Sequence, residues 1–359
     1  MRAAALGLAC LAVSTAAACG RPQAGFGLTT PRPSDSAPAA SRDNGAATPA
    51  ADTASSPLPS ATAAPPVADT VRRLIAAIDP AKLDDHMVAL AGVGSRDPRH
   101  PAHAKAVAYL KEQLGAIGVT VESFRNVHQG VPLESLLVTI DPPGGPPAAG
   151  WVMLCAHYDS ISNRTAGWNA ATSEAPGADD DATGVAALLE YARILARERA
   201  TLRQRVVLAF FDGEELFFKG SGAYVASLPK PYPYSAVVNI DMVGFNPLAD
   251  RLDLISYTSA STALRDRVVA ANERYATGIA PLVQQLAVDG NTILDAAPFG
   301  LAGVPAVALV ERYGDPDRTY PGNGTFHTVN DTPNTVTNKR LWLKAAKLTF
   351  ATALELALQ

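Results

Sequence analysis

The sequence predicts a three-layer α/β/α sandwich, in which helices cover both faces of a central mixed, mostly parallel sheet. Two observations lead to this prediction. Short apolar runs of strand length alternate along the chain with longer segments that carry apolar residues at helical spacing. The run Val206–Phe211 is apolar at every position, as expected of a parallel strand that is buried on both faces. With 48% hydrophobic and 18% charged residues, the chain has a globular composition and room for a large core.

The predicted domain spans residues 68–359. Helices are predicted where apolar residues recur at helical spacing, with Asp79-Pro80 as the cap and first turn of the second helix and Gly115 as a stop after the third. Strands are predicted at the shorter apolar runs. The predicted helices cover residues 71–78, 80–90, 103–114, 184–198, 222–228, 263–275 and 339–358. The predicted strands cover residues 119–126, 135–141, 151–157, 206–211, 236–242, 252–257 and 304–310.

Residues 1–67 are predicted to precede this domain. Residues 1–18 have the features of an export signal, because one Arg precedes an apolar stretch that is too short to cross a membrane and that ends in small residues. Cys19 follows, and the segment resembles a bacterial lipoprotein signal, although Ala16 stands where such signals usually have Leu. An ordinary signal peptide, cleaved near residue 18, is the alternative.

Residues 19–67 are rich in Ala, Pro, Ser and Thr, and they predict a disordered tether because they cannot bury enough surface to offset chain entropy. A tether favours an exported protein that is held at the cell envelope by a lipid anchor on Cys19, with secretion as the alternative. Cys10 belongs to the signal, so Cys155 is left as a small buried hydrophobe of the domain. The net charge of −4 and the absence of a basic run predict no nucleic-acid partner, and a monomer is expected.

Residues of the types that bind metals are concentrated at predicted strand ends and near helix starts. They are His157, the run Asp179-Asp180-Asp181, the pair Glu214-Glu215, Asp241 and His327. Each alone has an ordinary explanation, such as a core histidine, a helix cap, a buried carboxylate or a surface loop. Because the carboxyl ends of parallel strands meet at one edge of a sheet, we expect these side chains to lie together. Two imidazoles among several carboxylates, with no basic cluster nearby, are the ligand set expected for zinc.

Five motifs, in this order along the chain, resemble those of the zinc aminopeptidases of peptidase family M28, the bacterial leucyl aminopeptidase family. They are AHYDS (156–160), PGADDDATG (176–184), DGEE (212–215) followed by GSGAY (220–224), NIDM (239–242) and FHTVNDT (326–332). The resemblance covers nearly the whole domain. It implies the zinc-peptidase form of the sandwich, two zinc ions per chain, and peptide substrates from which N-terminal residues are released.

The resemblance also implies a role for each matching residue. His157 and Asp241 would bind one zinc ion, and Glu215 and His327 would bind the other. Asp180, the middle acid of its run, would bridge both ions. Three anionic ligands roughly balance two dications and leave the pair Lewis acidic.

Two further roles and one backbone feature follow from the same resemblance. Asp159 would orient His157, and Glu214 would be the general base that takes a proton from the attacking water and returns it to the departing amine. A cis peptide bond is implied between Asp180 and Asp181. The alternative is a trans bond with Asp181 as a helix cap.

The chain departs from the family pattern at three places. Residues 216–219 (LFFK) replace a small residue and Leu, residues 294–296 (LDA) replace Ser-Asp-His, and Phe326 replaces Tyr. The oxyanion donor is therefore open, with Tyr313 and Tyr320 as candidates. Candidates for an apolar substrate pocket are Phe217, Phe218 and Phe299.

Two other functions remain open. A glutaminyl-cyclase-like acyltransferase shares this fold with a single zinc ion, and an inactive member of the fold would serve as a binding domain. The complete set of ligands together with the base favours the two-zinc hydrolase over both. Dipeptidase and carboxypeptidase specificities also remain open.

Overall fold

A computed structural model describes residues 66–280, 282–286, 294–311 and 322–359 of the 359-residue chain. These residues belong to one compact unit, Thr62–Gln359. The predicted signal, Cys19 and the predicted tether up to residue 65 lie outside the described residues, as do Tyr313 and Tyr320. Among the residues described, no helix combines the length and hydropathy needed to span a membrane.

The described chain alternates helices and strands as expected. Its α-helices are α1 (Val67–Ala76), α2 (Pro80–Ala91), α3 (His103–Ile117), α4 (Ala182–Glu198), α5 (Lys219–Ser227), α6 (Thr262–Arg274), α7 (Ala296–Leu301) and α8 (Lys339–Ala357). Its strands are β1 (Val121–His128), β2 (Val131–Ile140), β3 (Trp151–His157), β4 (Val206–Phe211), β5 (Tyr234–Asp241), β6 (Leu252–Ser256), β7 (Leu282–Leu286) and β8 (Ala306–Val310).

The strands form one mixed sheet in the order β1-β2-β4-β3-β5-β8-β6-β7. The four central strands β4, β3, β5 and β8 are parallel to one another. On one side β2 runs antiparallel to β4 and β1 antiparallel to β2, whereas on the other side β6 runs antiparallel to β8 and pairs with β7 in parallel. The predicted mixed sheet with a parallel centre is therefore confirmed.

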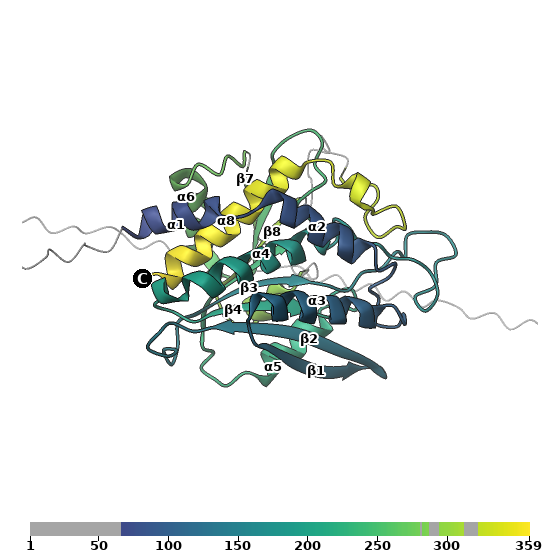
Figure 1. Ribbon diagram of the computed structural model, residues 1–359, viewed down its shortest axis with the longest axis horizontal. Helices are drawn as coiled ribbons and strands as arrows, with labels where there is room; N and C mark the ends of the chain where they lie inside the picture. The colour runs from purple at the N-terminus through teal and green to yellow at the C-terminus, as the bar shows by residue number, and fades with distance from the viewer. Residues whose placement is uncertain (1–65, 281, 287–293, 312–321) are drawn as a thin grey trace, which may run out of the picture. The chain divides into compact units, whose positions relative to one another are not determined.

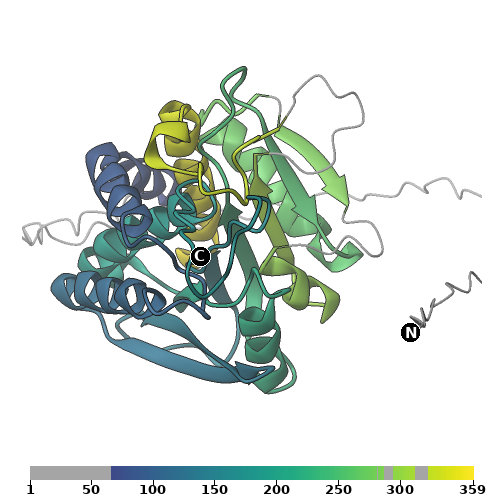
Figure 2. The ribbon, with the colours of Figure 1, turned by 90° about the vertical axis from the view of Figure 1, so that its right-hand side faces the viewer.

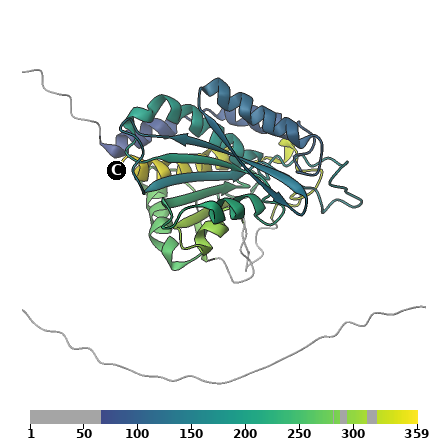
Figure 3. The same ribbon diagram turned by 90° about the horizontal axis from the view of Figure 1, so that it is seen from below.

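Helices cover both faces of this sheet. Alternate residues of the strands, among them Leu154 and Val238, pack with α1, α2, α3, α4, α6 and α8 into the larger core (Figure 1). The intervening residues, among them Met153 and Val237, pack with α5 and α7 on the opposite face (Figure 3). Cys155 is fully buried in this second layer, as expected. The three-layer sandwich is thus confirmed.

Two elements were not predicted. Strand β7 is short and lies at the edge of the sheet, and α7 has only six residues, so neither produces a clear periodic pattern. Strand β1 lies two residues later than predicted and β2 begins four residues earlier, because β1 extends to His128 and β2 starts at Val131 around a tight hairpin at Gln129-Gly130. Helix α5 begins at Lys219 rather than at residue 222.

Candidate metal centre

The sheet register places the predicted ligands at one edge. Strand β3 pairs Cys155 with Asn239 of β5, so two residues further along each strand His157 and Asp241 reach the same level. His157 also pairs with Phe211, the last residue of β4, and Glu214 and Glu215 follow within four residues. Figure 2 looks from the side towards which these parallel strands run. The register therefore brings four of the candidate residues together at the carboxyl ends of the parallel strands, as expected: His157, Glu214, Glu215 and Asp241.

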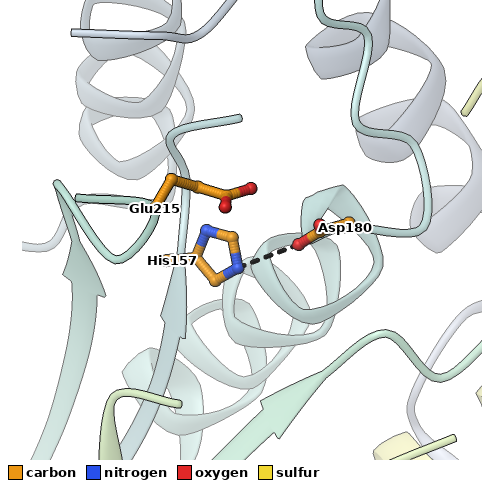
Figure 4. A group of neighbouring side chains, drawn as sticks. All are labelled: His157, Asp180 and Glu215. Carbon is orange, nitrogen blue, oxygen red and sulfur yellow. Dashed lines mark ion pairs between the residues drawn. The ribbon is translucent and has the colours of Figure 1, made fainter. Parts of the chain in front are cut away.

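Asp180 lies between the two imidazoles. Its Oδ1 atom is 3.1 Å from Nε2 of His157, and its Oδ2 atom is 3.2 Å from Nε2 of His327. Figure 4 shows Asp180 and Glu215 on neighbouring sides of the His157 ring. Nε2 of His327 is also 2.9 Å from Oε2 of Glu215. One carboxylate therefore joins two sets of ligands, one around each imidazole.

Asp241 and Asp181 complete the set on the His157 side. Oδ2 of Asp241 is 3.5 Å from Nε2 of His157. The ligand atoms of His157, Asp181 and Asp241 lie within 4.8 Å of one another, and so do those of His157, Asp180 and Glu215. Asp181 belongs to the run of candidate residues at 179–181, but the family resemblance implies no metal-binding role for it.

The residues present fit zinc. Asp181 Oδ2, Glu215 Oε1 and Asp241 Oδ2 are buried, and they accept no hydrogen bond within the described part of the chain. Buried carboxylate oxygens without a donor are costly unless a cation is bound beside them. Imidazole nitrogens and carboxylate oxygens are ligands that zinc prefers. The chemistry of the donor set therefore matches the predicted metal.

Asp159 connects the end of β3 to the turn that carries the two glutamates. Its Oδ1 accepts a hydrogen bond from the backbone N–H of Glu214 and its Oδ2 accepts one from that of Glu215, both at 3.2 Å. Nδ1 of His157 lies 3.4 Å from the same Oδ1 and 3.2 Å from the Asp159 carbonyl oxygen. Asp159 thus lies beside Nδ1 of the His157 ring, whereas the candidate ligands Asp180 and Asp241 lie beside Nε2. The predicted contact between Asp159 and His157 is present, and Asp159 also holds the backbone of Glu214 and Glu215 through two hydrogen bonds.

The peptide bond between Asp180 and Asp181 is cis, as predicted. Asp181 also caps α4, because its Oδ1 accepts a hydrogen bond of 2.8 Å from the backbone N–H of Gly184. Gly177, which opens this loop, has a φ of 54° and lies so close to Ser160 and the Asp180 carbonyl that a Cβ atom would overlap them. Only glycine fits this position.

Two residues that support the loop of Asp180 were missed by the sequence analysis. Asp331 accepts hydrogen bonds from the backbone N–H groups of Asp179 and Asp180, at 3.0 and 3.1 Å. It belongs to the FHTVNDT motif, so its carboxylate was visible there as a candidate. The fully buried Arg96 donates to the carbonyl oxygens of Tyr158, at 2.6 Å, and Gly177, at 2.8 Å. No local pattern in the sequence singled out Arg96.

The carboxylates change the pKa values of both imidazoles. Burial favours a lower pKa for His157, but Asp241 and then Asp159 and Asp180 outweigh burial and raise this pKa well above its usual value. Burial also opposes protonation of His327, yet Glu215 and Asp180 raise the pKa of His327 to about 10. Carboxylates that hold an imidazolium proton so firmly provide the negative potential that also binds a divalent cation.

Three carboxylates of the site differ in the direction in which their pKa values shift. Although burial disfavours its charge, the two imidazoles hold the pKa of Asp180 well below its usual range. Burial and the nearby charge of Asp180 raise the pKa of Glu215 to about 7. Burial also raises the pKa of Glu214 well above its usual value, although the charge of His157 opposes that shift. Asp180 is thus the most firmly ionised of these three acids.

A cavity of about 580 Å³ opens above these residues. Its apolar lining comprises Ile161, Phe217, Phe218, Met242, Leu294, Val310 and Phe326. Seven non-glycine residues of the described chain have positive φ, and five of them line this cavity: Phe217, Phe218, Met242, Leu294 and His327. Backbone strain of this kind is costly and clusters at functional sites. The cavity is therefore the candidate substrate site.

The predicted aromatic residues are only partly in this cavity. Phe217 and Phe218 line it, and Phe217 is 80% exposed. The expectation for Phe299 is wrong, because this ring is fully buried beneath α7 and packs against Phe211 and Tyr224. Phe299 lies in α7, a six-residue helix that the sequence does not predict, and its ring packs into the core instead of the cavity.

Several curated proteins are similar to this chain in sequence. YfbL, an uncharacterized protein of Escherichia coli strain K12, is 30% identical over 167 residues, which are 45% of this chain and 49% of YfbL. Leupeptin-inactivating enzyme 1 of Streptomyces exfoliatus is 27% identical over 237 residues, which are 64% of this chain and 48% of that enzyme. This chain therefore spans about half the length of the curated relatives that it matches.

Solved structures show the same fold. The LapA aminopeptidase of Legionella pneumophila superposes with a TM-score of 0.65 at 20% identity, over 81% of this chain and 75% of LapA. The glutaminyl cyclase of Bacteroides thetaiotaomicron superposes with a TM-score of 0.60 at 18% identity, over 77% of this chain and 97% of the cyclase. Residues 137–352, more than half of the chain, match the model of peptidase family M28, and the protein belongs to this family.

Proposed function

We propose that this protein is a two-zinc aminopeptidase that releases N-terminal residues from peptides. The observation that carries the proposal is the position of Asp180, whose two oxygens face the imidazoles of His157 and His327 at 3.1 and 3.2 Å. One carboxylate shared by two histidines is the arrangement expected of a ligand that bridges two ions. The names of the relatives, among them probable zinc metalloproteases and leucine aminopeptidases, support the same metal and reaction.

His157 and Asp241 would hold one zinc ion, Glu215 and His327 would hold the other, and Asp180 would contact both. Zinc bound there would polarise the scissile carbonyl and lower the pKa of a coordinated water. Asp159 keeps Nε2 of His157 directed at the site, because it occupies the Nδ1 side of the ring. The ligands are therefore oriented before substrate binds.

Glu214 is proposed as the general base. It lines the cavity, and its backbone N–H is held by Asp159. Burial raises the pKa of Glu214, which strengthens this carboxylate as a proton acceptor. Glu214 would take a proton from the attacking water and transfer it to the departing amine.

The charge of the cavity favours an exopeptidase. Its lining includes four acids, which attract a free α-ammonium group of a substrate: Asp180, Glu214, Glu215 and Asp241. Apolar side chains such as Phe218, Met242 and Leu294 line the same cavity and suit an apolar N-terminal side chain. We infer a preference for peptides with a free N-terminus and an apolar first residue.

Cellular location and assembly are part of the same proposal. A lipid on Cys19 would hold the enzyme at the cell envelope, with residues 19–67 as a tether that lets the domain reach soluble peptides. The enzyme would act as a monomer, because a single chain supplies every proposed ligand and the base.

The test combines zinc stoichiometry with a substrate panel. Purified protein is assayed with aminoacyl anilides and their N-acetylated analogues, with and without chelator, while zinc per chain is measured. Two zinc ions and chelator-sensitive cleavage of unblocked substrates support the proposal. One zinc ion with cyclisation of N-terminal Gln supports the cyclase alternative instead. No turnover of any substrate by the zinc-loaded protein supports the binding-domain alternative.

A further inference from the structure

Arg164 is the one lysine or arginine among the described residues that line the cavity. The other charged side chains there are the zinc-binding candidates, Glu214 and Glu311. Glu311 is buried and has a pKa well above its usual value, because of burial and of its neighbour Asp179. A guanidinium group carries a positive charge at neutral pH, so Arg164 adds a fixed positive charge to the lining of the cavity.

Arg164 is held in place beside His327. Its backbone N–H donates to the carbonyl oxygen of His327 at 2.9 Å, and its Nη1 donates to that of Phe326 at 3.0 Å. Its guanidinium carbon lies 5.7 Å from the centre of the Phe326 ring, which in turn stacks on the His327 ring at 3.6 Å between centroids. Arg164 is nevertheless an exposed residue. Its charge is thus fixed close to a proposed zinc ligand and is still open to solvent.

The hydrogen bonds that Arg164 makes with its own chain do not require a positive charge. The carbonyl oxygen of Phe326 needs one donor, which a neutral amide also provides, and the bond between the Arg164 N–H and His327 is independent of the side chain. A guanidinium group has five N–H donors in a planar fork that matches a carboxylate. One donor is used on Phe326, so others remain for a substrate anion.

We propose that Arg164 binds the C-terminal carboxylate of short substrates, so that the enzyme prefers di- and tripeptides with a free carboxylate. This inference rests on the proposed function, because it places the scissile carbonyl at the zinc ligands. A free peptide is a zwitterion, and the cavity is lined by buried or half-buried acids and by the exposed Arg164. Each residue beyond the scissile carbonyl adds about 3.3–3.6 Å. Because Arg164 lies over the Phe326 ring that stacks on His327, only a short peptide presents its carboxylate to Arg164 and its ammonium to the acids of the same cavity.

The test compares matched substrates that differ only in their C-terminal charge. Leu-Gly and Leu-Gly-Gly are each compared with their C-terminal amides, and the readout is the ratio of kcat/KM for the acid to that for the amide. We expect a ratio of about five in the native enzyme, near the upper end for an exposed ion pair. The ratio should fall when NaCl is raised from 0.1 to 1 M, because the Debye length shrinks from about 10 to about 3 Å.

Arg164→Gln keeps a donor for Phe326 and removes the charge, so the ratio should fall to about one. Arg164→Lys keeps the charge, so its ratio should exceed that of Arg164→Gln. The matched control is Arg197→Gln, an exposed arginine in the last turn of α4. It lies about 22 Å along the helix axis from the start of α4, so the native ratio should be retained.

Equal ratios in the native enzyme and Arg164→Gln, or a native ratio of one, would overturn the inference. Equal ratios in the Gln and Lys variants would also overturn it, because the charge would then have no effect. Failure of the proposed function looks different, because the zinc-loaded native enzyme would then cleave neither the acids nor the amides. Zinc content, measured for every variant, separates lost binding of the carboxylate from a disturbed His327.

Discussion

Replacing Asp159 by Asn tests how the metal centre is held in shape. The carboxylate accepts one hydrogen bond from each of the Glu214 and Glu215 backbone N–H groups, and its Oδ1 also lies 3.4 Å from Nδ1 of His157. An asparagine side chain has a single acceptor oxygen, and its amide group would face an N–H donor at the other position. Asp159→Asn therefore breaks at least one of these bonds while almost preserving side-chain volume.

The magnitude follows from the bond that is lost. A hydrogen bond to a charged group contributes about 1.5–3 kcal/mol, and about 1.4 kcal/mol corresponds to a factor of ten. Because Asp159 holds His157 and the backbone of Glu215, both proposed ligands, we expect zinc affinity to fall about 10- to 100-fold. The turnover of the zinc-saturated variant should also fall, because the backbone of Glu214 is held by the same carboxylate.

The assay is a competition titration of the apo protein with a chromogenic zinc chelator, followed by kinetics at saturating zinc. Asp141→Asn is the control, because Asp141 pairs with Arg205 through two hydrogen bonds and does not line the cavity. Native zinc affinity in Asp159→Asn would refute the reasoning, since the contacts of Asp159 would then not constrain the ligands.

Three other predictions address the base, the metal and the anchor. Glu214→Gln should retain zinc but lose about 10²- to 10⁴-fold in kcat, and native turnover would show that Glu214 is not the base. Zinc removal should lower the melting temperature, because Asp180, Glu215 and Asp241 are left crowded without a counter-charge; calorimetry that shows no change in the zinc-free protein would reject this account. Cys19→Ser should move the protein from the membrane to the soluble exported fraction; a native protein that already fractionates as soluble would favour the plain signal peptide.

Much of the candidate site was predictable because its residues lie next to strong local patterns. His157 and Asp241 end strands that are buried on both faces, and Glu215 lies four residues after a third such strand; strands of this kind are recognisable as apolar runs. The carboxyl ends of parallel strands meet at one edge, so the three side chains were expected together. The positions of Asp180 and His327 came from the family motifs, since no periodic pattern brings them to that edge.

The hydrogen bonds that support the candidate ligands come from distant parts of the chain. Asp331 reaches the N–H groups of Asp179 and Asp180 from about 150 residues away, and Arg96 joins the end of β3 to the loop before α4. Sequence patterns report burial within a segment, whereas a hydrogen bond between two loops depends on how the layers pack. Packing between distant segments also set the direction of β6, the burial of Phe299 and the position of Arg164 beside Phe326. The sequence by itself thus determined the sheet and most of the candidate zinc ligands, and only the tertiary structure decided which contacts orient those candidates and which side chains line the cavity.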